Sequence, residues 1–416
     1  MTPDPQSDVP EAVDGAEVAP TIVRLSAKAS GFARRGRPWL FRDDIVAGSP
    51  MPARLVRVLD ENDRDLGLGI TGGSKLALRM CGPWPCGEAT AGDVPSREAF
   101  FQARLDAAIG ARAGRLGPED GVRLVHAESD WLPGLVVDRY GDVLVLQVTS
   151  AFAQDSLDAI VPFLADRLGA ASVVARNDVP TRKREGLPQD VEVLHGVRKL
   201  ESSIVEGGVT HTVRPLTGHK TGFYLDQQPA RALVQSLAKG RRLLDLFCYQ
   251  GAFSLHGLRG GAVSALAVDQ SEEALAQAQH DAEANDLAGL QTRAGNVFDV
   301  VRQLRDKNEQ FDLIVLDPPA FAKSRRELPG AERGYRDLNR AALRLLAPNG
   351  FLVTCTCSHH VDGARLEELV RQASAGLPFR VALRQRLGAG HDHPALITHP
   401  ESEYLKVVLV QRVDGA

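Results

Sequence analysis

The chain has 416 residues, of which 44% are hydrophobic and 25% are charged, and its formal net charge at pH 7 is −4. These values are ordinary for a globular protein, and the length allows two or three domains with separate cores. No apolar run reaches the roughly 20 residues of a membrane helix, and the N-terminus lacks the basic-then-apolar order of a signal peptide. We therefore expect a cytoplasmic protein with no membrane partner.

The cysteines and the charges narrow the class further. The five cysteines show no CxxC spacing, and no second group of cysteines and histidines completes a zinc site. The sequence therefore predicts reduced thiols and no bound metal. Residues 1–20 carry acidic side chains and no Lys or Arg, whereas residues 24–57 are mainly basic. The negative net charge does not exclude nucleic-acid binding, because attraction to phosphate is local.

The N-terminal part changes character near residue 20. Residues 1–20 are rich in Pro, Asp, Glu and Ala, and we interpret them as a disordered leader. From 21 to 88 short apolar runs alternate with glycine turns, which predicts a small β-barrel. Gly and Pro residues between 82 and 97 mark a boundary. The expected strands of the barrel are 21–25, 53–59, 66–70 and 76–80.

The middle of the chain predicts a small α+β domain over 98–197. A helix is expected at 98–115. It is followed by strands at 123–127, 134–139 and 143–149, a helix at 154–168, and strands at 172–176 and 191–194.

From 198 to 416 strands and helices alternate. This rhythm predicts a parallel, doubly wound sheet, so the fold class is α/β. The expected strands are 242–247, 265–269, 311–316 and 350–355. The expected helices are 254–259, 271–285, 331–346 and 361–375.

Polar side chains fall at the ends of these strands, where α/β proteins bind ligands. Asp245 precedes a loop that ends at Gly251 and leads into a helix. We expect its carboxylate to hold an ammonium group, directly or through water, while backbone N–H groups take a carboxylate. Asp269 ends the next strand and suits ribose hydroxyls, and Asn296 offers an amide to an adenine edge. Together they favour S-adenosylmethionine over NAD, because the GxGxxG fingerprint is absent.

The following strands carry the residues expected to do chemistry. The strand 311–316 ends in Asp317-Pro318-Pro319, whose prolines stop the strand and leave carbonyl groups facing a pocket for a flat polar group such as a nucleobase. Cys357 lies where the next strand gives way to a loop, whereas Cys355 lies inside that strand and is expected in the core. A thiolate that adds to carbon 6 of cytosine makes carbon 5 reactive toward a sulfonium methyl group.

Cys357 is therefore the expected nucleophile. Asp317 is expected to hydrogen bond the pyrimidine edge or to move a proton. We expect an electropositive loop to promote the thiolate. His359 and His360 either contribute to that charge or lie on the surface.

A basic stretch begins directly after the Asp-Pro-Pro loop. We expect its cations to follow RNA phosphates beside the target pocket, because a paired base must be extruded before it reacts. Stacking surfaces are expected from Phe321, Tyr335, Phe223 and Tyr224. The basic residues of this stretch are Lys323, Arg325, Arg326, Arg333, Arg336, Arg340 and Arg344.

These motifs resemble the RlmI family of bacterial 23S rRNA methyltransferases over nearly the whole chain after residue 20. The family implies an N-terminal PUA barrel that binds RNA, a small central domain and a class I methyltransferase domain. It also implies 5-methylcytosine formation with Cys357 as nucleophile, on 23S rRNA or a large-subunit assembly intermediate. The segments that carry the resemblance are GRPWLF at 36–41, AESD and LPGL between 127 and 135, GHKTGFYLDQ at 218–227, DLFCY with Gly251 at 245–251, DPP at 317–319, RGY at 333–335, and TCS at 356–358.

The same resemblance assigns further site residues. The cofactor-binding set becomes Phe223, Tyr224, Asp226, Gln227, Asp245, Phe247, Tyr249, Gly251, Asp269, Asn296 and Asp317. The substrate-binding set is Pro318, Pro319, Phe321, Lys323, Arg333 and Tyr335.

Two departures from the family pattern leave the target base open. Asn296 stands where an acidic residue is expected, and His359 and His360 follow the TCS motif in place of small or apolar residues. Guanine N7 is the alternative target, and it needs no thiol because that nitrogen is already nucleophilic. A non-catalytic RNA-binding assembly factor and a small-molecule methyltransferase are alternatives from other classes. The sequence also leaves open whether two copies form a homodimer.

Overall fold

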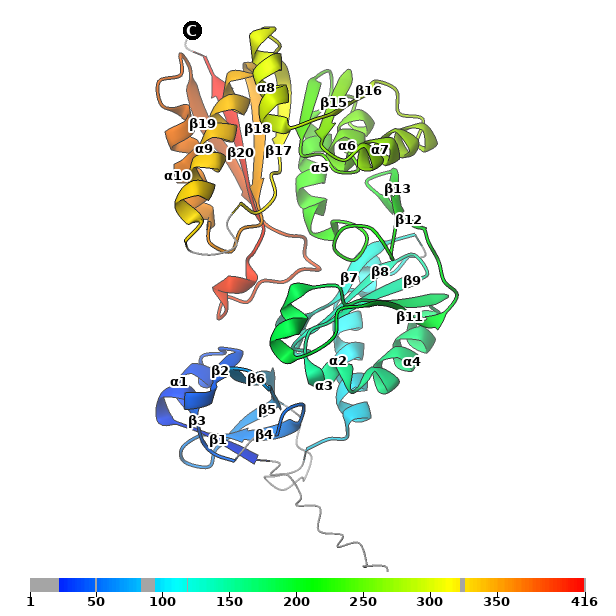
Figure 1. Ribbon diagram of the computed structural model, residues 1–416, viewed down its shortest axis with the longest axis vertical. Helices are drawn as coiled ribbons and strands as arrows, with labels where there is room; N and C mark the ends of the chain where they lie inside the picture. The colour runs from blue at the N-terminus through cyan, green and yellow to red at the C-terminus, as the bar shows by residue number, and fades with distance from the viewer. Residues whose placement is uncertain (1–21, 49–50, 84–93, 118, 322–325, 415–416) are drawn as a thin grey trace, which may run out of the picture.

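The fold is seen in a computed structural model, which describes residues 22–48, 51–83, 94–117, 119–321 and 326–414. Figure 1 shows three bodies arranged along the long axis, with the N-terminal strands at one end and the C-terminal sheet at the other. Across these ranges no helix has the length and apolar character needed to cross a membrane. The expected leader, residues 1–20, lies outside the described residues.

The N-terminal body is a six-stranded sheet with the order β2-β6-β5-β4-β1-β3. The four expected strands are present, but the sequence analysis missed β2, β3 and helix α1. The two strands are too short to show alternation. Helix α1 begins at a cap, because the Ser26 hydroxyl accepts a hydrogen bond from the Ala29 N–H at 3.2 Å. The elements are β1 (Ile22–Leu25), α1 (Ala27–Arg34), β2 (Trp39–Phe41), β3 (Ile45–Ala47), β4 (Leu55–Leu59), β5 (Asp65–Thr71) and β6 (Leu76–Gly82).

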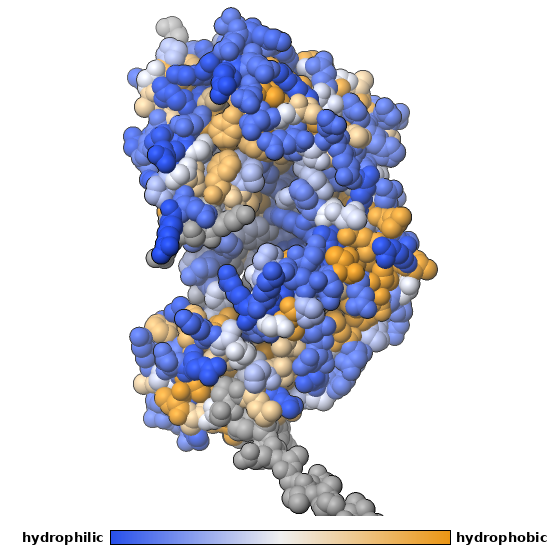
Figure 2. All heavy atoms as spheres, in the orientation of Figure 1, coloured by the Kyte–Doolittle hydropathy of each residue, from blue (hydrophilic) through white to orange (hydrophobic). Residues whose placement is uncertain are grey.

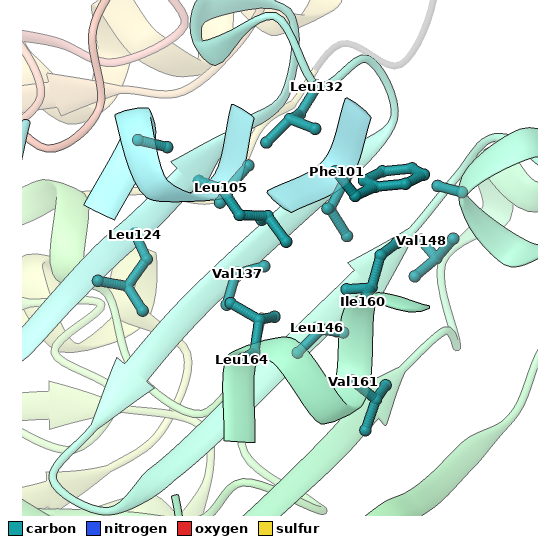
Figure 3. Close-up of a cluster of buried hydrophobic side chains, with 14 of the residues drawn as sticks. Phe101, Leu105, Leu124, Leu132, Val137, Leu146, Val148, Ile160, Val161 and Leu164 are labelled. Carbon is teal, nitrogen blue, oxygen red and sulfur yellow. The ribbon is translucent and has the colours of Figure 1, made fainter. Parts of the chain in front are cut away.

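The middle body is a five-stranded sheet with the order β11-β10-β9-β8-β7, and helices α2 and α4 pack on it. Figure 3 shows Phe101 and Leu105 of α2 meeting Ile160 and Leu164 of α4 over Val137 of β8. The expected helix at 154–168 is divided into a short α3 and a longer α4. The elements are α2 (Arg97–Gly110), β7 (Gly121–His126), β8 (Leu135–Tyr140), β9 (Val143–Val148), α3 (Ala151–Gln154), α4 (Leu157–Leu168), β10 (Ser172–Arg176) and β11 (Val191–Gly196).

The third body is a seven-stranded sheet with the order β16-β15-β14-β17-β18-β20-β19, with helices on both faces. A hairpin of β12 (Ser202–Glu206) and β13 (Val209–Val213) precedes it. The elements of the body are α5 (Gln228–Leu237), β14 (Arg242–Leu246), α6 (Ala252–Arg259), β15 (Ser264–Asp269), α7 (Glu272–Ala284), β16 (Leu290–Ala294), α8 (Val297–Asp306), β17 (Phe311–Leu316), α9 (Leu328–Arg344), β18 (Leu346–Thr356), α10 (Gly363–Ser374), β19 (Arg380–Leu387) and β20 (Lys406–Val413).

The α/β class is confirmed, but the expectation of a purely parallel sheet is wrong at one edge. Strand β20 runs antiparallel to both β18 and β19. The remaining five strands, β14 to β18, are parallel to one another. Because all five point the same way, their carboxyl ends form one continuous edge.

The loop between β19 and β20, residues 388–405, leaves the third body and reaches the other two (Figure 1). His399 packs edge-on against Trp39 with ring centroids 4.4 Å apart, and Trp39 Nε1 donates to Glu128 Oε1 at 3.0 Å. Nearer the start of the loop, Asp392 Oδ2 accepts a hydrogen bond from the Arg123 N–H at 2.9 Å. These contacts tie the three bodies together around the hollow that Figure 2 shows on this face.

Candidate active site

A cavity of about 430 Å³ opens at the carboxyl ends of the parallel strands. Strand β14 lies between β15 and β17, so the chain reverses its direction of travel across the sheet here. Ligands of open α/β sheets bind at such a switch point. The cavity brings together most of the residues expected for cofactor and target base, namely Phe223, Tyr224, Asp226, Gln227, Phe247, Tyr249, Asp269, Asn296, Asp317, Pro318, Pro319, Phe321 and Cys357.

The loop between β14 and α6 has a constrained backbone. Phe247 and Tyr249 have φ of +63° and +49°, a region that residues with a side chain rarely adopt. Gly251 has φ of +66°, and a Cβ at this position would lie 2.9 Å from the Cβ of Ala278. Only glycine fits there without displacement. Backbone strain of this kind is typical of ligand-binding loops.

Asp245 does not line the cavity, which does not support the direct contact expected with an ammonium group. Its carboxyl group is fully buried, and Oδ2 accepts hydrogen bonds from the Ser254 N–H at 3.0 Å and from the Ser254 hydroxyl at 2.8 Å. Burial raises the pKa of Asp245 to about 7. Asp245 therefore anchors the first turn of α6, whose N-terminal end follows the cavity loop.

Asp269 lies at the cavity with both carboxylate oxygens already oriented. Oδ2 accepts from the Tyr249 N–H at 2.9 Å, and Oδ1 accepts from the Ser271 N–H at 3.0 Å. Each oxygen keeps a further lone pair that can accept from a ribose hydroxyl. The residue thus fits the ribose of an adenosyl cofactor.

Asn296 and Phe298 form the next part of the wall. Asn296 Oδ1 caps helix α8 by accepting from the Phe298 N–H at 2.9 Å. The amide nitrogen is then the group left to donate, which suits a ring nitrogen of adenine better than its amino group. Phe298, which the sequence analysis missed, is 42% exposed and lines the cavity, where it offers a flat apolar surface to a base.

The segment ahead of α5, residues 219–227, forms another wall. The His219 ring stacks on Tyr249 with centroids 4.1 Å apart and planes 8° apart. Lys220 Nζ lies 2.6 Å from Asp226 Oδ2, which also accepts from the Tyr404 hydroxyl at 2.8 Å. Burial alone would raise the pKa of Asp226, but the Lys220 ammonium holds it below the usual range.

Phe223 is not a free stacking surface, contrary to expectation. The Phe223 ring is buried, with the Arg231 guanidinium 4.8 Å from its centre and the His211 ring 4.9 Å away. Arg231 in turn forms a two-point ion pair with Glu206 at 2.6 and 2.8 Å and donates to the Tyr224 carbonyl at 2.8 Å. The buried ion pair therefore supports the wall from behind.

Asp317 stands at the end of β17 and faces the target side of the cavity. Gln227 Nε2 donates to its Oδ2 at 3.0 Å. Burial raises the pKa of Asp317 to about 7, so the carboxyl group exists in both protonation states near neutral pH. Such a group can donate or accept a proton under working conditions.

Cys357 is half-buried and lines the same cavity, whereas Cys355 is fully buried in the strand, as expected. Burial and the neighbouring Asp317 raise the pKa of the Cys357 thiol, while Lys220 lowers it. The expectation that its surroundings promote the thiolate is therefore wrong for the protein without substrate. Burial and Lys406 lower the pKa of His359, so that imidazole adds no charge at neutral pH.

The expected substrate residues beyond the Asp-Pro-Pro loop lie in three different places. Tyr335 is fully buried, where it packs against Phe321 with centroids 4.9 Å apart and accepts from the Thr356 hydroxyl at 2.8 Å. It is therefore a support for the Cys357 strand and not a stacking surface. Arg333 is exposed on α9 and does not line the cavity. Lys323 and Arg325 lie outside the described residues.

Several cavity residues were not singled out from the sequence. His219 and Lys220 stand in the GHKTGFYLDQ segment, so the motif was found but its charged members were not weighed. Arg231 comes one turn later and shows no local signal, because its partner Glu206 is distant in sequence. Among the described residues no cluster of metal-ligating side chains occurs.

Comparisons with known protein families agree with this geometry. A family model described as S-adenosylmethionine-dependent methyltransferase matches residues 131–394. A second model, described as a PUA-like domain, matches residues 23–81. The cavity residues fit the cofactor named by the first model, because they include carboxylate, amide and aromatic groups of the kind that bind ribose and adenine.

Similar whole proteins are found among curated sequences and solved structures. Ribosomal RNA large subunit methyltransferase I of Aeromonas hydrophila is 37% identical over 400 residues, which cover 94% of this chain and 99% of that protein. The protein of the same name from Photobacterium profundum is 38% identical over 383 residues, covering 90% and 94%. A methyltransferase crystallised with S-adenosylhomocysteine has a TM-score of 0.79 at 22% identity, covering 94% of this chain and 99% of that one. A methyltransferase from Streptococcus mutans has a TM-score of 0.77 at the same identity and coverage. These two structures show the shared fold.

Proposed function

Because the chain belongs to the ribosomal RNA large subunit methyltransferase I family of S-adenosylmethionine-dependent methyltransferases, we propose that it methylates carbon 5 of a cytosine in 23S ribosomal RNA. The observation that carries the proposal is the meeting of Cys357 and Asp317 in one cavity. Their strands, β18 and β17, are neighbours in the sheet. A thiol and a titrating carboxyl group beside a cofactor wall are the groups that C5 methylation requires.

The cofactor part of the cavity is divided among three strand ends. Asp269 would accept hydrogen bonds from the ribose hydroxyls, the Asn296 amide would donate to adenine, and Phe298 would cover the base. Bound there, S-adenosylmethionine supplies an electrophilic methyl group. Asp245 holds the first turn of α6 in place without touching the cofactor.

The target part of the cavity works through a covalent adduct on the base. Cys357 Sγ adds to carbon 6 as a thiolate while protonated Asp317 gives its proton to ring nitrogen N3. Carbon 5 then has enamine character and takes up the methyl group. Transfer of the carbon-5 proton to water restores the double bond between carbons 5 and 6 and expels the thiolate. N3 returns its proton to Asp317, which completes the cycle.

A trapping experiment tests this proposal. RNA that carries 5-fluorocytidine at the target cannot lose a proton from carbon 5, so a cysteine adduct should persist after methylation. We expect a denaturation-resistant complex with the wild type and none with Cys357→Ala. Cys355→Ala is the matched control, because that thiol lies two residues earlier on the same strand but is buried in the core.

Guanine N7 methylation is the second candidate function. The raised pKa of Cys357 favours this candidate, because it disfavours the thiolate that C5 methylation needs. It requires no thiol, so Cys357→Ala would then methylate rRNA near the wild-type rate. Digestion of the product RNA and mass spectrometry of its nucleosides separate 5-methylcytidine from 7-methylguanosine. Near wild-type activity of the variant with 7-methylguanosine as product would replace the proposal.

The proposed partner is 23S rRNA or a large-subunit assembly intermediate, which places the enzyme in the cytoplasm with the ribosomes. The PUA-like body and the exposed start of α9, with Arg326 and Arg333, are the surfaces that support RNA contact. Phosphate contacts of this kind make affinity fall steeply with salt. Activity that does not depend on salt would favour a small-molecule substrate.

We also propose that two copies of the chain form a homodimer along strand β11. This strand is at the edge of the middle sheet, so its outer N–H and C=O groups are available to another strand. Val191 in this strand is 41% exposed, and Val197 and Leu200, which follow the end of the strand, are 59% and 65% exposed. Figure 2 shows an apolar patch on that side of the middle body. Antiparallel pairing of two copies that is centred on His195, and that continues past the end of β11 at Gly196, would set exposed Glu192 opposite exposed Arg198.

A further inference from the structure

The groups around Cys357, the proposed nucleophile, disfavour its thiolate. Asp317 and Asp226 both raise the pKa of Cys357, as does burial. Two tyrosine hydroxyls, of Tyr224 and Tyr335, also interact with the thiol and carry no positive charge. A thiolate formed here therefore needs a cation that faces it.

Two lysines are close enough to interact with the Cys357 thiol. Lys406 is buried behind the loop, where its Nζ donates to the Ser358 carbonyl at 2.9 Å and to the Tyr404 carbonyl at 3.1 Å. It does not line the cavity. Lys220 does line the cavity, together with Cys357.

The position of Lys220 is tightly set. Its ammonium group lies 4.3 Å from the centre of the Tyr224 ring and 5.8 Å from that of Tyr404, in addition to the ion pair with Asp226. Its backbone has φ of +53°, which residues with a side chain rarely adopt. The side chain is 33% exposed, so the charge stays accessible from the cavity.

We propose that Lys220 supplies the positive charge that stabilises the Cys357 thiolate, a role that rests on the proposed function because only the C5 reaction needs this thiolate. When the thiol loses its proton to water, the ammonium group offsets the charge left on sulfur. The Tyr224 and Tyr404 rings keep the ammonium group at the cavity, and the ion pair with Asp226 anchors it. Lys220 thus acts on the nucleophile without exchanging a proton with it.

The rate at which iodoacetamide alkylates Cys357 tests this role without methyl transfer. The full-length protein is treated between pH 6 and 10, and the Cys357 peptide is followed by mass spectrometry. Lys220→Met should raise the apparent pKa of alkylation by about one unit, which slows the reaction at pH 7.5 roughly tenfold. Lys220→Arg should stay near the wild type, because the charge remains.

Three further variants make the test specific. Lys199→Met removes an exposed ion pair with Asp142 far from the cavity and should change nothing. Asp226→Asn should speed alkylation, because it removes a negative charge that opposes the thiolate. Circular dichroism and thermal unfolding show whether each variant is folded. An unchanged alkylation profile in folded Lys220→Met, or a shift only in Lys406→Met, would overturn the proposal.

The experiment also separates this proposal from the one it rests on. If Cys357→Ala still methylates rRNA while Lys220→Met shifts the alkylation profile, C5 chemistry is wrong but the electrostatic role stands. If 5-fluorocytidine RNA is trapped on Cys357 while Lys220→Met leaves alkylation unchanged, the C5 chemistry stands and the role of Lys220 is wrong.

Discussion

At the scale of single residues, Asp317 gives the reaction a defined dependence on pH. The proposed mechanism needs protonated Asp317, whose pKa is about 7, and ionised Cys357, whose pKa is raised. Below pH 7 the rate should rise about tenfold per unit, because the thiolate fraction grows. Above pH 7 loss of the Asp317 proton cancels that gain, so the profile becomes flat until the thiol itself is ionised.

Replacing the carboxyl group by an amide should remove the break in this profile. Asp317→Asn keeps a donor toward N3 but has no proton to lose, so its rate should continue to rise through pH 7. The rate itself should fall by about 10² to 10⁴, the usual contribution of a general acid. Single-turnover rates between pH 5.5 and 9 measure both effects. A break at pH 7 that persists in Asp317→Asn would assign it to another group.

Phe298 should contribute to cofactor affinity and little else. Its exposed ring lines the cavity beside Asn296 and belongs to the first turn of α8. Phe298→Ala should weaken S-adenosylmethionine binding about five- to tenfold, a loss of roughly 1 kcal/mol in stacking. Isothermal calorimetry measures the affinity, and the single-turnover rate at saturating cofactor should stay the same. A large fall in that rate would mean that the ring also orders the target side.

The site residues that could be predicted from the sequence are those at the ends of strands. Asp269, Asp317 and Cys357 follow apolar runs directly, and parallel strands bring their ends to one edge whatever the side chains between them. Tyr335 and Phe223 were misjudged because an aromatic side chain in a helix or loop faces either core or ligand, and local sequence does not distinguish the two. Tertiary packing decides this: here both rings are buried, Phe223 in the wall of the cavity and Tyr335 behind it.

At the scale of elements, the β12–β13 hairpin is joined to the third body by buried imidazoles. His211 of β13 and His256 of α6 approach at 3.2 Å between their Nε2 atoms, and His256 Nδ1 lies 2.8 Å from Gln235 Oε1. Burial and the nearby Arg231 lower the pKa of His256 to about 4. The ring is therefore neutral in the folded protein at pH values where the unfolded chain already binds a proton.

This pKa difference predicts acid sensitivity. Stability is unaffected above the unfolded pKa of about 6.5 and falls as the pH drops toward 4, because the unfolded state takes up the proton first. Between pH 7.5 and pH 5, His256 should lower the free energy of unfolding by about 2 kcal/mol. His256→Gln should lose that part of the pH dependence in urea unfolding, whereas His280→Gln, an exposed histidine on α7, should behave as the wild type. Equal pH dependence in all three proteins would refute the assignment.

Several elements with a clear period were predicted, but helices α5 and α8 were missed although both are amphipathic. Strands β14, β15 and β17 are apolar runs bounded by polar residues, and α7 and α9 have helical spacing. Strands β19 and β20 were missed although β20 is strongly apolar, because the long loop 388–405 separates them and hides their pairing. Strand β20 completes the sheet next to β18, and this antiparallel pair closes the side of the sheet beside Cys357.

At the scale of the whole molecule, the long loop that escaped prediction connects the bodies. Residues 388–405 contact the PUA-like body through His399 and the middle body through Asp392, and the loop ends at Leu405, which lines the cavity. An RNA segment held by the PUA-like body would thus lie at a fixed distance from the target pocket. If the target base is extruded as proposed, this arrangement explains how a PUA-like body could help to position the RNA beside the pocket.

The proposed homodimer gives the last prediction. If β11 and the residues directly after it pair with those of a second copy, Val197 lies near the centre of a new interface, and a charge there would be buried without a partner. Val197→Asp should convert the dimer to a monomer of 44.8 kDa in size-exclusion chromatography with light scattering. Val263→Asp is the matched control, because Val263 is equally exposed, at 63%, on a different body.

The register of the pairing can be tested by charge reversal. Pairing centred on His195 sets Glu192 of one copy against Arg198 of the other, so Glu192→Arg or Arg198→Glu alone places like charges together and should weaken the dimer. The double variant restores opposite charges and should restore dimerisation. A double variant weaker than either single variant would exclude this register, and a wild type that stays monomeric at all concentrations would exclude the dimer. In the pairing we propose, the two middle sheets become one continuous sheet, with a catalytic body on each side.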